Sequence, residues 1–230
     1  MANTYFNFKK FSVNQDRCAM KVGTDGVLLG ATAEGGRNIL DIGTGTGLVA
    51  LMMAQRFPYA AVTGIDIDDD AFTQARENAL ASPFAERINI KKADITSFTS
   101  SISFDCIVCN PPFFENALSC PDSQRAMARH TSSLPFNALI QKVATILSED
   151  GRCTIIIPTD CLGRIEEECA YNNLFINRKS FIKTVERKQP KRVIITISKR
   201  CTPQESSTQC LMENGQRSTW YNEVCKDFYL

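Results

Sequence analysis

The chain has 230 residues, of which 43% are hydrophobic and 22% are charged. This length and composition are typical of one globular domain with a sizeable core. A formal net charge of +1 excludes a protein whose whole surface attracts nucleic acid. We find no secretory signal or transmembrane run, so we expect a cytoplasmic protein with no membrane partner.

Strands and helices alternate along the first three quarters of the chain. Apolar runs predict strands at residues 39–42, 61–65, 87–91, 104–109 and 153–157. Helical spacing predicts helices at residues 47–57, from 69 or 70 to about 81, 134–147 and 160–172. Such alternation predicts a doubly wound, mostly parallel α/β sheet that is covered on both faces.

The pattern changes after residue 172. Residues 174–185 and 192–200 are extended runs with no room for a helix between them, so they should pair as an antiparallel hairpin and bring the sheet to seven strands. We then expect a polar loop at 201–208, a last strand at 209–213 with a tight Asn214-Gly215 turn, and a segment at 220–230 that folds back. The prediction is a single domain with its core sheet at 39–200 and an extension at 201–230.

The chain has ten cysteines and a single histidine, His130. Cys106 and Cys109 form a CxxC pair, but residues three apart in a strand face opposite sides of the sheet. A zinc site is therefore poorly supplied with ligands. We expect buried free thiols and no metal.

A glycine-rich turn follows the first predicted strand of the core. Glycines allow the backbone to approach a ligand closely, and the helix that follows supplies free N–H groups. A dinucleotide-binding enzyme would have G-x-G-x-x-G here, whereas this chain has G-x-G-x-G, which disfavours a nicotinamide oxidoreductase. Asp41 precedes the turn, where it could meet a cationic amine. Asp66 and Asp94 follow the next two strands, placed for ribose hydroxyls and for an adenine amino group.

The sequence of this segment resembles the first motif of S-adenosyl-L-methionine-dependent methyltransferases. That resemblance implies a Rossmann-like class I fold and S-adenosyl-L-homocysteine as the product. It implies cofactor contacts from Asp41, Gly43, Gly45, Gly47, Asp66, Ile67, Asp94 and Asn110.

The tetrapeptide Asn110-Pro111-Pro112-Phe113 follows the apolar run 104–109. An Asn side chain accepts hydrogen bonds from an amino group, prolines stiffen the loop, and an aromatic ring offers a stacking face. The motif resembles the Asp/Asn-Pro-Pro-aromatic motif of enzymes that methylate amino groups in planar systems. The resemblance implies that Asn110 and Pro111 accept hydrogen bonds from the target amine and Phe113 stacks on its ring. Methyl then moves by in-line displacement without a dedicated base.

Segments at both ends of the chain narrow the family. Residues 20–30, 128–131 and 226–230 closely resemble those of the bacterial valine tRNA (adenine-N6)-methyltransferases, which modify the adenine next to the anticodon. The resemblance implies that a lid closes over the methionine end of the cofactor, with Lys21, Gly23, Thr24 and Asp25 in it. The target base of a tRNA loop is already partly unstacked, which lowers the cost of flipping it. We find no sign of an obligate protein partner.

Basic residues are unevenly distributed. Residues 178–200 are rich in Lys and Arg, with Glu186 as the one acid, and a basic arm lies within residues 1–38. Such patches suit a phosphate backbone, although ordinary solvated surfaces also carry charge. The expected tRNA contacts are Lys9, Lys10, Arg129, His130, Arg187, Lys188, Lys191 and Arg192.

Other activities fit the amine motif as well. Enzymes that methylate a protein glutamine amide usually carry a helical domain before the glycine turn and often a Tyr as fourth motif residue, whereas here 38 residues precede Ile39 and position 113 is Phe. Methylation of a guanine amine in ribosomal RNA is an alternative that the sequence distinguishes poorly from methylation of a tRNA adenine. An RNA-binding module without catalysis is disfavoured by the intact glycine turn, Asp66 and Asn110.

Overall fold

The computed structural model describes residues 3–112 and 134–230. The strands of this part are β1 (Tyr5–Asn7), β2 (Ser12–Asn14), β3 (Asn38–Ile42), β4 (Ala61–Asp66), β5 (Ile88–Lys92), β6 (Phe104–Cys109), β7 (Leu147–Pro158), β8 (Phe175–Val185), β9 (Arg192–Ser198), β10 (Glu205–Glu213) and β11 (Gln216–Arg217). The α-helices are α1 (Thr24–Thr32), α2 (Leu48–Arg56), α3 (Asp69–Leu80), α5 (Phe136–Ile146), α6 (Leu162–Tyr171) and α7 (Thr219–Cys225). Short 3₁₀ turns lie at Ala85–Arg87 and Thr159–Cys161.

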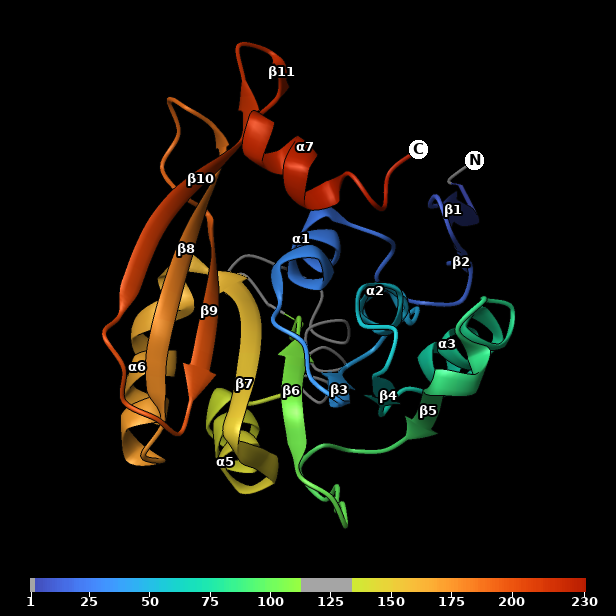
Figure 1. Ribbon diagram of the computed structural model, residues 1–230, viewed down its shortest axis with the longest axis horizontal. Coiled ribbons are helices and arrows are strands. Elements are labelled where there is room, and N and C mark those ends of the chain that lie inside the picture. Colours follow the sequence, from blue (N-terminus) through green and yellow to red (C-terminus); the bar gives the residue numbers. More distant parts are fainter. Residues whose placement is uncertain (1–2, 113–133) are drawn as a thin grey trace, which may run out of the picture.

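Nine of these described strands form one sheet in the order β11-β10-β8-β9-β7-β6-β3-β4-β5 (Figure 1). The strands β7, β6, β3, β4 and β5 are parallel, and β9 lies antiparallel between β7 and β8. The predicted α/β sheet with its antiparallel hairpin is therefore confirmed, but the described sheet has nine strands and not the seven that were predicted. β1 and β2, which the sequence did not indicate, pair separately.

The outer edge of the sheet differs from the prediction. β10 begins at Glu205 and runs parallel to β8, so the polar loop expected at 201–208 is wrong in its second half, and the sheet continues beyond residue 200. A strand edge presents unpaired N–H and C=O groups, and β10 satisfies those of β8. The Asn214-Gly215 turn then joins β10 to the short antiparallel β11.

Helix boundaries also shift. Asp68, and not Asp69 or Asp70, caps α3, since its carboxylate accepts a hydrogen bond from the N–H of Ala71 at 2.8 Å. β7 begins at Leu147, where the helix predicted at 134–147 was expected to end, and is therefore longer than the strand predicted at 153–157. Helix α1, which lies within the expected lid segment, was not predicted.

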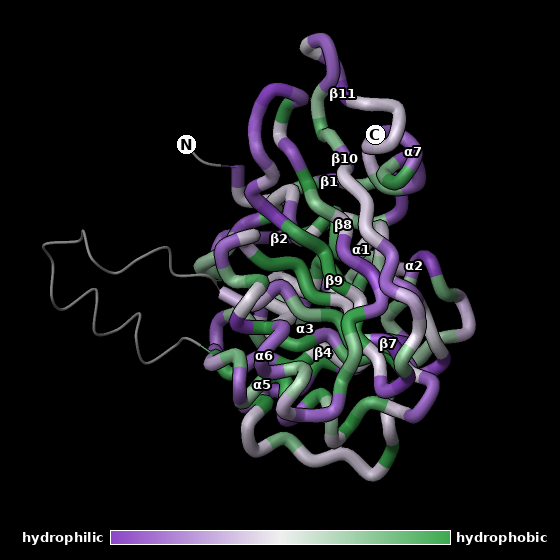
Figure 2. Tube along the Cα trace, turned by 90° about the vertical axis from the view of Figure 1, so that its left-hand side faces the viewer, coloured by the Kyte–Doolittle hydropathy of each residue, from purple (hydrophilic) through white to green (hydrophobic). Residues whose placement is uncertain are grey.

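Two hydrophobic cores cover the two faces of the sheet. One holds buried side chains of α1 and α2 together with the sheet residues Ile39, Val62 and Val108. The other holds α5 and α6 with Leu40 and Ile107. Neighbouring strand residues thus face opposite cores, as the two-residue period of a strand requires. β9, which is buried from Val193 to Ser198, is accordingly coloured mostly as hydrophobic in Figure 2.

The two ends of the chain pack together above α1 and α2. The rings of Phe8 and Tyr229 stack with centroids 6.0 Å apart, and Phe228 is buried. The backbone N–H of Lys9 donates to the carbonyl of Phe228 at 2.8 Å. The expected return of residues 220–230 to the domain is confirmed, and α7 forms part of that segment.

The register of the parallel strands defines one edge of the sheet. Ile42 pairs with both Ile65 and Cys109, so the residues that follow these three strands meet at the same edge, on strands about 4.8 Å apart. The strand order also reverses here, because β4 and β5 extend to one side of β3 and β6 and β7 to the other. Such a switch point is where open α/β sheets bind ligands.

A buried carboxylate holds the turn after β3. Asp41 is 1% exposed, and its Oδ2 accepts hydrogen bonds from Thr44 Oγ1 at 2.7 Å and from the N–H of Ala50 at 3.1 Å. These bonds connect the glycine turn to the first turn of α2. Burial raises the pKa of Asp41 to about 7, although the two hydrogen bonds act in the opposite direction.

Replacing Asp41 with Asn removes the titrating carboxyl group and keeps an oxygen that can accept hydrogen bonds. In the wild type, the folded state holds a proton on Asp41 up to about pH 7, whereas the ordinary pKa is 3.8, so the free energy of unfolding falls as the pH rises through this window. We expect the free energy of unfolding of Asp41→Asn, relative to wild type, to increase with pH across the same window, measured by urea unfolding.

Glu149→Gln is a matched control, because the Glu149 side chain is exposed in the folded state. The free energy of unfolding of Glu149→Gln, relative to wild type, should not rise with pH across this window. If the relative free energy of unfolding of Asp41→Asn also failed to rise with pH, the assigned effect of burial would be contradicted.

Candidate active site

The glycine turn presents its backbone to open space. Gly43, Gly45 and Gly47 have φ values of +67°, +55° and +81°, which disfavour other residues. A Cβ built on Gly43 would meet no atom within 4 Å, and one on Gly45 would meet only the Gly43 carbonyl at 4.0 Å. Gly47 instead lies against α3, where its Cβ would be 3.3 Å from Cα of Ala75. Gly47, the N-cap of α2, has no side chain, and Asp41 accepts from one N–H of the first turn, that of Ala50, so the other N–H groups at the start of α2 can meet a ligand.

Asp66 connects the glycine turn to the start of α3. Its Oδ2 accepts from the N–H of Gly45 at 2.9 Å and its Oδ1 from that of Asp68 at 3.0 Å. Burial raises the pKa of Asp66, while these backbone hydrogen bonds act to lower it. The next residue, Ile67, is 60% exposed. An acceptor and an apolar surface therefore lie side by side at the end of β4.

Asp94 lies on the same side of the site as Asp66. The N–H of Ala93 donates to the Asp66 carbonyl at 2.8 Å, which brings the end of β5 beside the end of β4. The Asp94 carboxylate accepts from the N–H of Thr96 at 2.8 Å and so shapes its own turn.

Asn110 follows β6 on the opposite side of the glycine turn from Asp66. Its Oδ1 is buried and has no hydrogen-bond partner within residues 3–112 and 134–230. An unsatisfied buried acceptor costs about 1–3 kcal/mol, so this atom suits a ligand that brings an N–H group. Pro111 is buried and Pro112 is exposed. Phe113, Arg129 and His130 lie outside the described residues.

The segment that leads into α1 is held by hydrogen bonds. The N–H of Val22 donates to Gln15 Oε1 at 2.8 Å, and Lys21 is exposed. Gly23 is the N-cap of α1. A Cβ on Gly26 would lie 3.1 Å from Leu48 Cδ2, so the start of α1 lies against the start of α2. Thr24 and Asp25, which begin α1, therefore lie close to the glycine turn.

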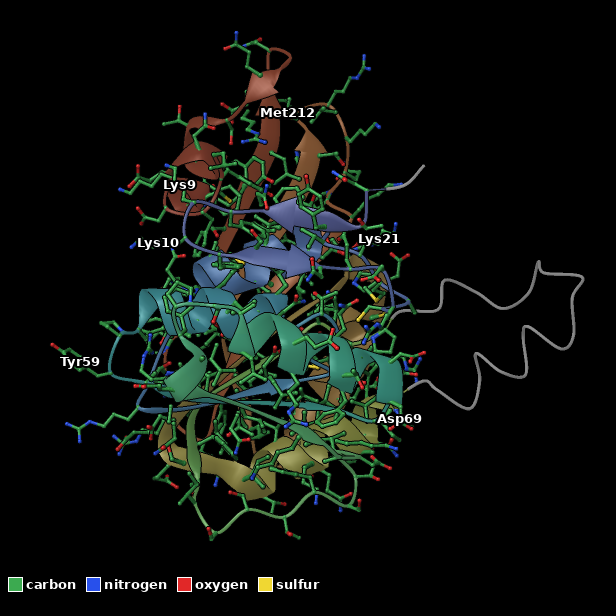
Figure 3. All side chains as sticks on the ribbon, turned by 90° about the vertical axis from the view of Figure 1, so that its right-hand side faces the viewer. Lys9, Lys10, Lys21, Tyr59, Asp69 and Met212 are labelled. Atoms are coloured by element: carbon green, nitrogen blue, oxygen red, sulfur yellow. The ribbon has the colours of Figure 1, made fainter. Side chains whose placement is uncertain are left out.

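The expected tRNA-binding residues fall in two separate places. Lys9 and Lys10 lie on the opposite side of the molecule from Lys21 and Asp69 (Figure 3). Lys9 Nζ donates to the carbonyl of Lys226 at 2.6 Å, which ties it to the C-terminal segment. These lysines are therefore not brought to the site.

The second basic group lies at the edge that carries the site. Pro158, at the carboxyl end of β7, pairs with Arg192, so the turn before β9 emerges at the same edge as Asn110. Arg187, Lys188 and Lys191 are exposed on this turn. The structure thus brings this basic turn, and not the basic arm, to the candidate site.

Sequence reasoning missed two buried polar residues of α3. Asn78 Nδ2 donates to the carbonyls of Asn14 and Thr46, both at 2.8 Å, and joins the N-terminal segment to the glycine turn. Gln74 Oε1 accepts from the N–H of Arg17 at 2.9 Å. Both side chains are 1% exposed. The available signal was their position four residues apart on the helix face that also carries its buried alanines.

In the described part of the chain, no group of three or more His, Cys, Asp or Glu side chains is arranged to hold a metal ion. Among the described helices, none is long and apolar enough to cross a membrane.

Comparison of the fold with solved structures gives low sequence identity and clear structural likeness. A predicted O-methyltransferase from Agrobacterium tumefaciens has a TM-score of 0.70 at 19% identity and covers 89% of this chain and 96% of its own. A protein from Listeria monocytogenes, assigned to the class I S-adenosylmethionine-dependent methyltransferases, has a TM-score of 0.58 at 16% identity, with coverage of 87% and 65%. These likenesses confirm the class I methyltransferase fold.

Sequence comparison identifies the family. The methyltransferase small domain model matches residues 20–161. A protein of Bacteroides thetaiotaomicron named tRNA1(Val) (adenine(37)-N6)-methyltransferase is 46% identical and covers 100% of this chain and 99% of its own length. A protein with the same name from Mannheimia succiniciproducens is 40% identical and covers 98% of this chain and 94% of its own. The chain therefore belongs to the family of tRNA1(Val) (adenine(37)-N6)-methyltransferases.

Proposed function

We propose that this chain transfers a methyl group from S-adenosyl-L-methionine to the N6 amine of adenine 37 in valine tRNA. The observation that carries the proposal is the buried, unpaired Oδ1 of Asn110 at the switch point of the sheet, beside the open glycine turn. Full-length relatives with this activity in their names support it. A tRNA substrate is consistent with a cytoplasmic enzyme.

The residues at the sheet edge fit the cofactor. The open space beside Gly43 and Gly45 and the start of α2 would receive its polar end, and Asp66 would accept from its ribose hydroxyls. Ile67 would cover a face of its adenine, and Asp94 would accept from the adenine amine. When bound, S-adenosyl-L-methionine supplies a methyl group that its sulfonium makes electrophilic. Asp41 supports this binding by holding the turn.

The target amine would be bound at the end of β6. Asn110 Oδ1 and the Pro111 carbonyl accept hydrogen bonds from the two N6 hydrogens of the flipped adenine, and this directs the nitrogen lone pair away from both oxygens. Fixing the nitrogen in line with the methyl group supplies the catalysis, because positioning alone removes much of the barrier of a two-reactant step. Neither oxygen retains a proton at neutral pH, so the N6 proton leaves to water.

The basic turn would bind the tRNA backbone next to the flipped base. Arg187, Lys188 and Lys191 extend from the edge that carries Asn110 and meet phosphates, which fix the orientation of the RNA. Lys9 and Lys10, on the opposite side of the molecule, are the weaker candidates for this contact.

Purified protein incubated with labelled S-adenosyl-L-methionine and total tRNA tests the function directly. We expect N6-methyladenosine at position 37 of valine tRNA, located by mass spectrometry of nuclease fragments. Methylguanosine in added ribosomal RNA, or a methylated glutamine in added protein, with tRNA unmodified, would instead support one of the other amine substrates.

Asn110→Ala removes the proposed acceptor of the N6 amine. We expect kcat for tRNA methylation to fall about 100-fold or more, as when one polar contact to a reacting group is lost, while the cofactor Kd from calorimetry stays near wild type. Asn177→Ala is a matched control, since Asn177 also carries a buried Oδ1 without a partner among the described residues. Asn177 lies in β8 beside the carboxyl end of β9, at the edge of the sheet opposite the candidate site. Wild-type turnover by Asn110→Ala would exclude the proposed role.

Asp66→Ala removes the acceptor at the end of β4 and its hydrogen bonds to Gly45 and Asp68. We expect the cofactor Kd to rise about tenfold or more, since a hydrogen bond to a charged group is worth about 1.5–3 kcal/mol. The matched control is Asp69→Asn, which changes an exposed carboxylate that begins α3 and pairs with Lys92 of β5, and it should leave this Kd unchanged. Equal dissociation constants for Asp66→Ala and wild type, measured by calorimetry, would refute the assignment.

A further inference from the structure

An ion pair joins the segment before the core sheet to the basic turn. Asp25 Oδ2 accepts from Arg192 Nε at 2.8 Å, across 167 positions of sequence. The two side chains are 30% and 28% exposed, so the pair is more protected from water than the Arg200–Asp150 pair, at 56% and 75%. Sequence reasoning had placed Asp25 with the cofactor and Arg192 with the RNA.

The elements on both sides of this pair are fixed. Asp25 is in the first turn of α1, which begins with a hydrogen bond from the N–H of Val27 to the Gly23 carbonyl at 3.2 Å. Thr159, directly after β7, donates from its N–H to the Lys191 carbonyl at 3.3 Å. Arg192 therefore sits at the base of an anchored turn, and its carboxylate partner comes from a second anchored element.

We infer that Asp25 is a positioning residue for tRNA, and not a cofactor ligand. Together with the Lys191 carbonyl, which accepts from Arg192 Nη1 at 3.1 Å, it fixes the plane of the Arg192 guanidinium at the base of the basic turn, beside the edge where the target base would enter. A planar guanidinium held in one orientation suits a phosphate group, and less side-chain entropy is then lost when the phosphate binds. This inference rests on the proposed function, since it takes the tRNA backbone as the partner.

Charge alone predicts the opposite effect from positioning. Asp25 is a negative charge paired with Arg192, at the base of the turn that carries Arg187, Lys188 and Lys191. If Asp25 acted only through its charge, its neutralisation would strengthen phosphate binding. If it positions Arg192, its neutralisation weakens tRNA binding although the patch becomes more positive. The sign of the change in tRNA affinity therefore separates the two roles.

The experiment compares Asp25→Asn, Asp25→Glu, Arg192→Lys and the double variant Asp25→Asn/Arg192→Lys. Binding of valine tRNA is measured directly by fluorescence anisotropy, and binding of S-adenosyl-L-methionine by calorimetry. We expect Asp25→Asn to raise the tRNA Kd about two- to fivefold, the size expected for a partly exposed ion pair, with an unchanged cofactor Kd. Asp25→Glu, which keeps the carboxylate, should recover most of the lost affinity.

The double variant tests whether Asp25 acts through Arg192. Lys keeps the charge but has no Nε and no planar fork, so Asp25→Asn should cost no further tRNA affinity in the Arg192→Lys background. Asp150→Asn, which breaks the ion pair at the opposite end of β9, should change neither Kd.

A raised cofactor Kd with unchanged tRNA binding, tighter tRNA binding, or no change in either would overturn the inference. Because binding is measured without turnover, these results are separate from the proposed reaction. Wild-type protein that binds valine tRNA but leaves adenine 37 unmodified would instead count against the proposed function alone.

Discussion

The register between β3 and its two neighbours is the constraint on which the rest of the site depends. Because Ile42 pairs with both Ile65 and Cys109, the glycine turn, Asp66 and Asn110 leave the sheet side by side. A shift of one residue in either pairing would turn every side chain of a strand to the opposite core. Hydrophobic packing on both faces therefore fixes the relative position of the proposed cofactor and base sites.

Polar side chains then hold the glycine turn in place at this edge of the sheet. Asp41 and Asp66 both accept backbone hydrogen bonds from the glycine turn or the helix after it, at the cost of burying carboxylates and raising their pKa values. Asn78 adds a third connection, from α3 to the same turn. The turn is thus held from β3, β4 and α3 and needs little rearrangement on binding, which favours affinity.

The sequence was sufficient for the parallel core, since apolar runs and helical spacing are local signals, and for the positions of Asp66 and Asn110 at strand ends. It was insufficient for β10, whose polar first half gains its strand structure from the open edge of β8. It also did not predict the contact between Asp25 and Arg192, because an ion pair across 167 positions leaves no local pattern. Long-range pairings of this kind depend on the assembled fold.

The aromatic contact between the chain ends has a consequence for biosynthesis. Phe8 stacks on Tyr229, and Lys9 bonds to Phe228, so these contacts form only after residues 228 and 229 have been synthesised. Until then, the hydrophobic side chains of α1 that α7 covers are open to water or to a chaperone. The segment that leads to α1 can settle earlier, because Asn78 and Gln74 of α3 already hold it.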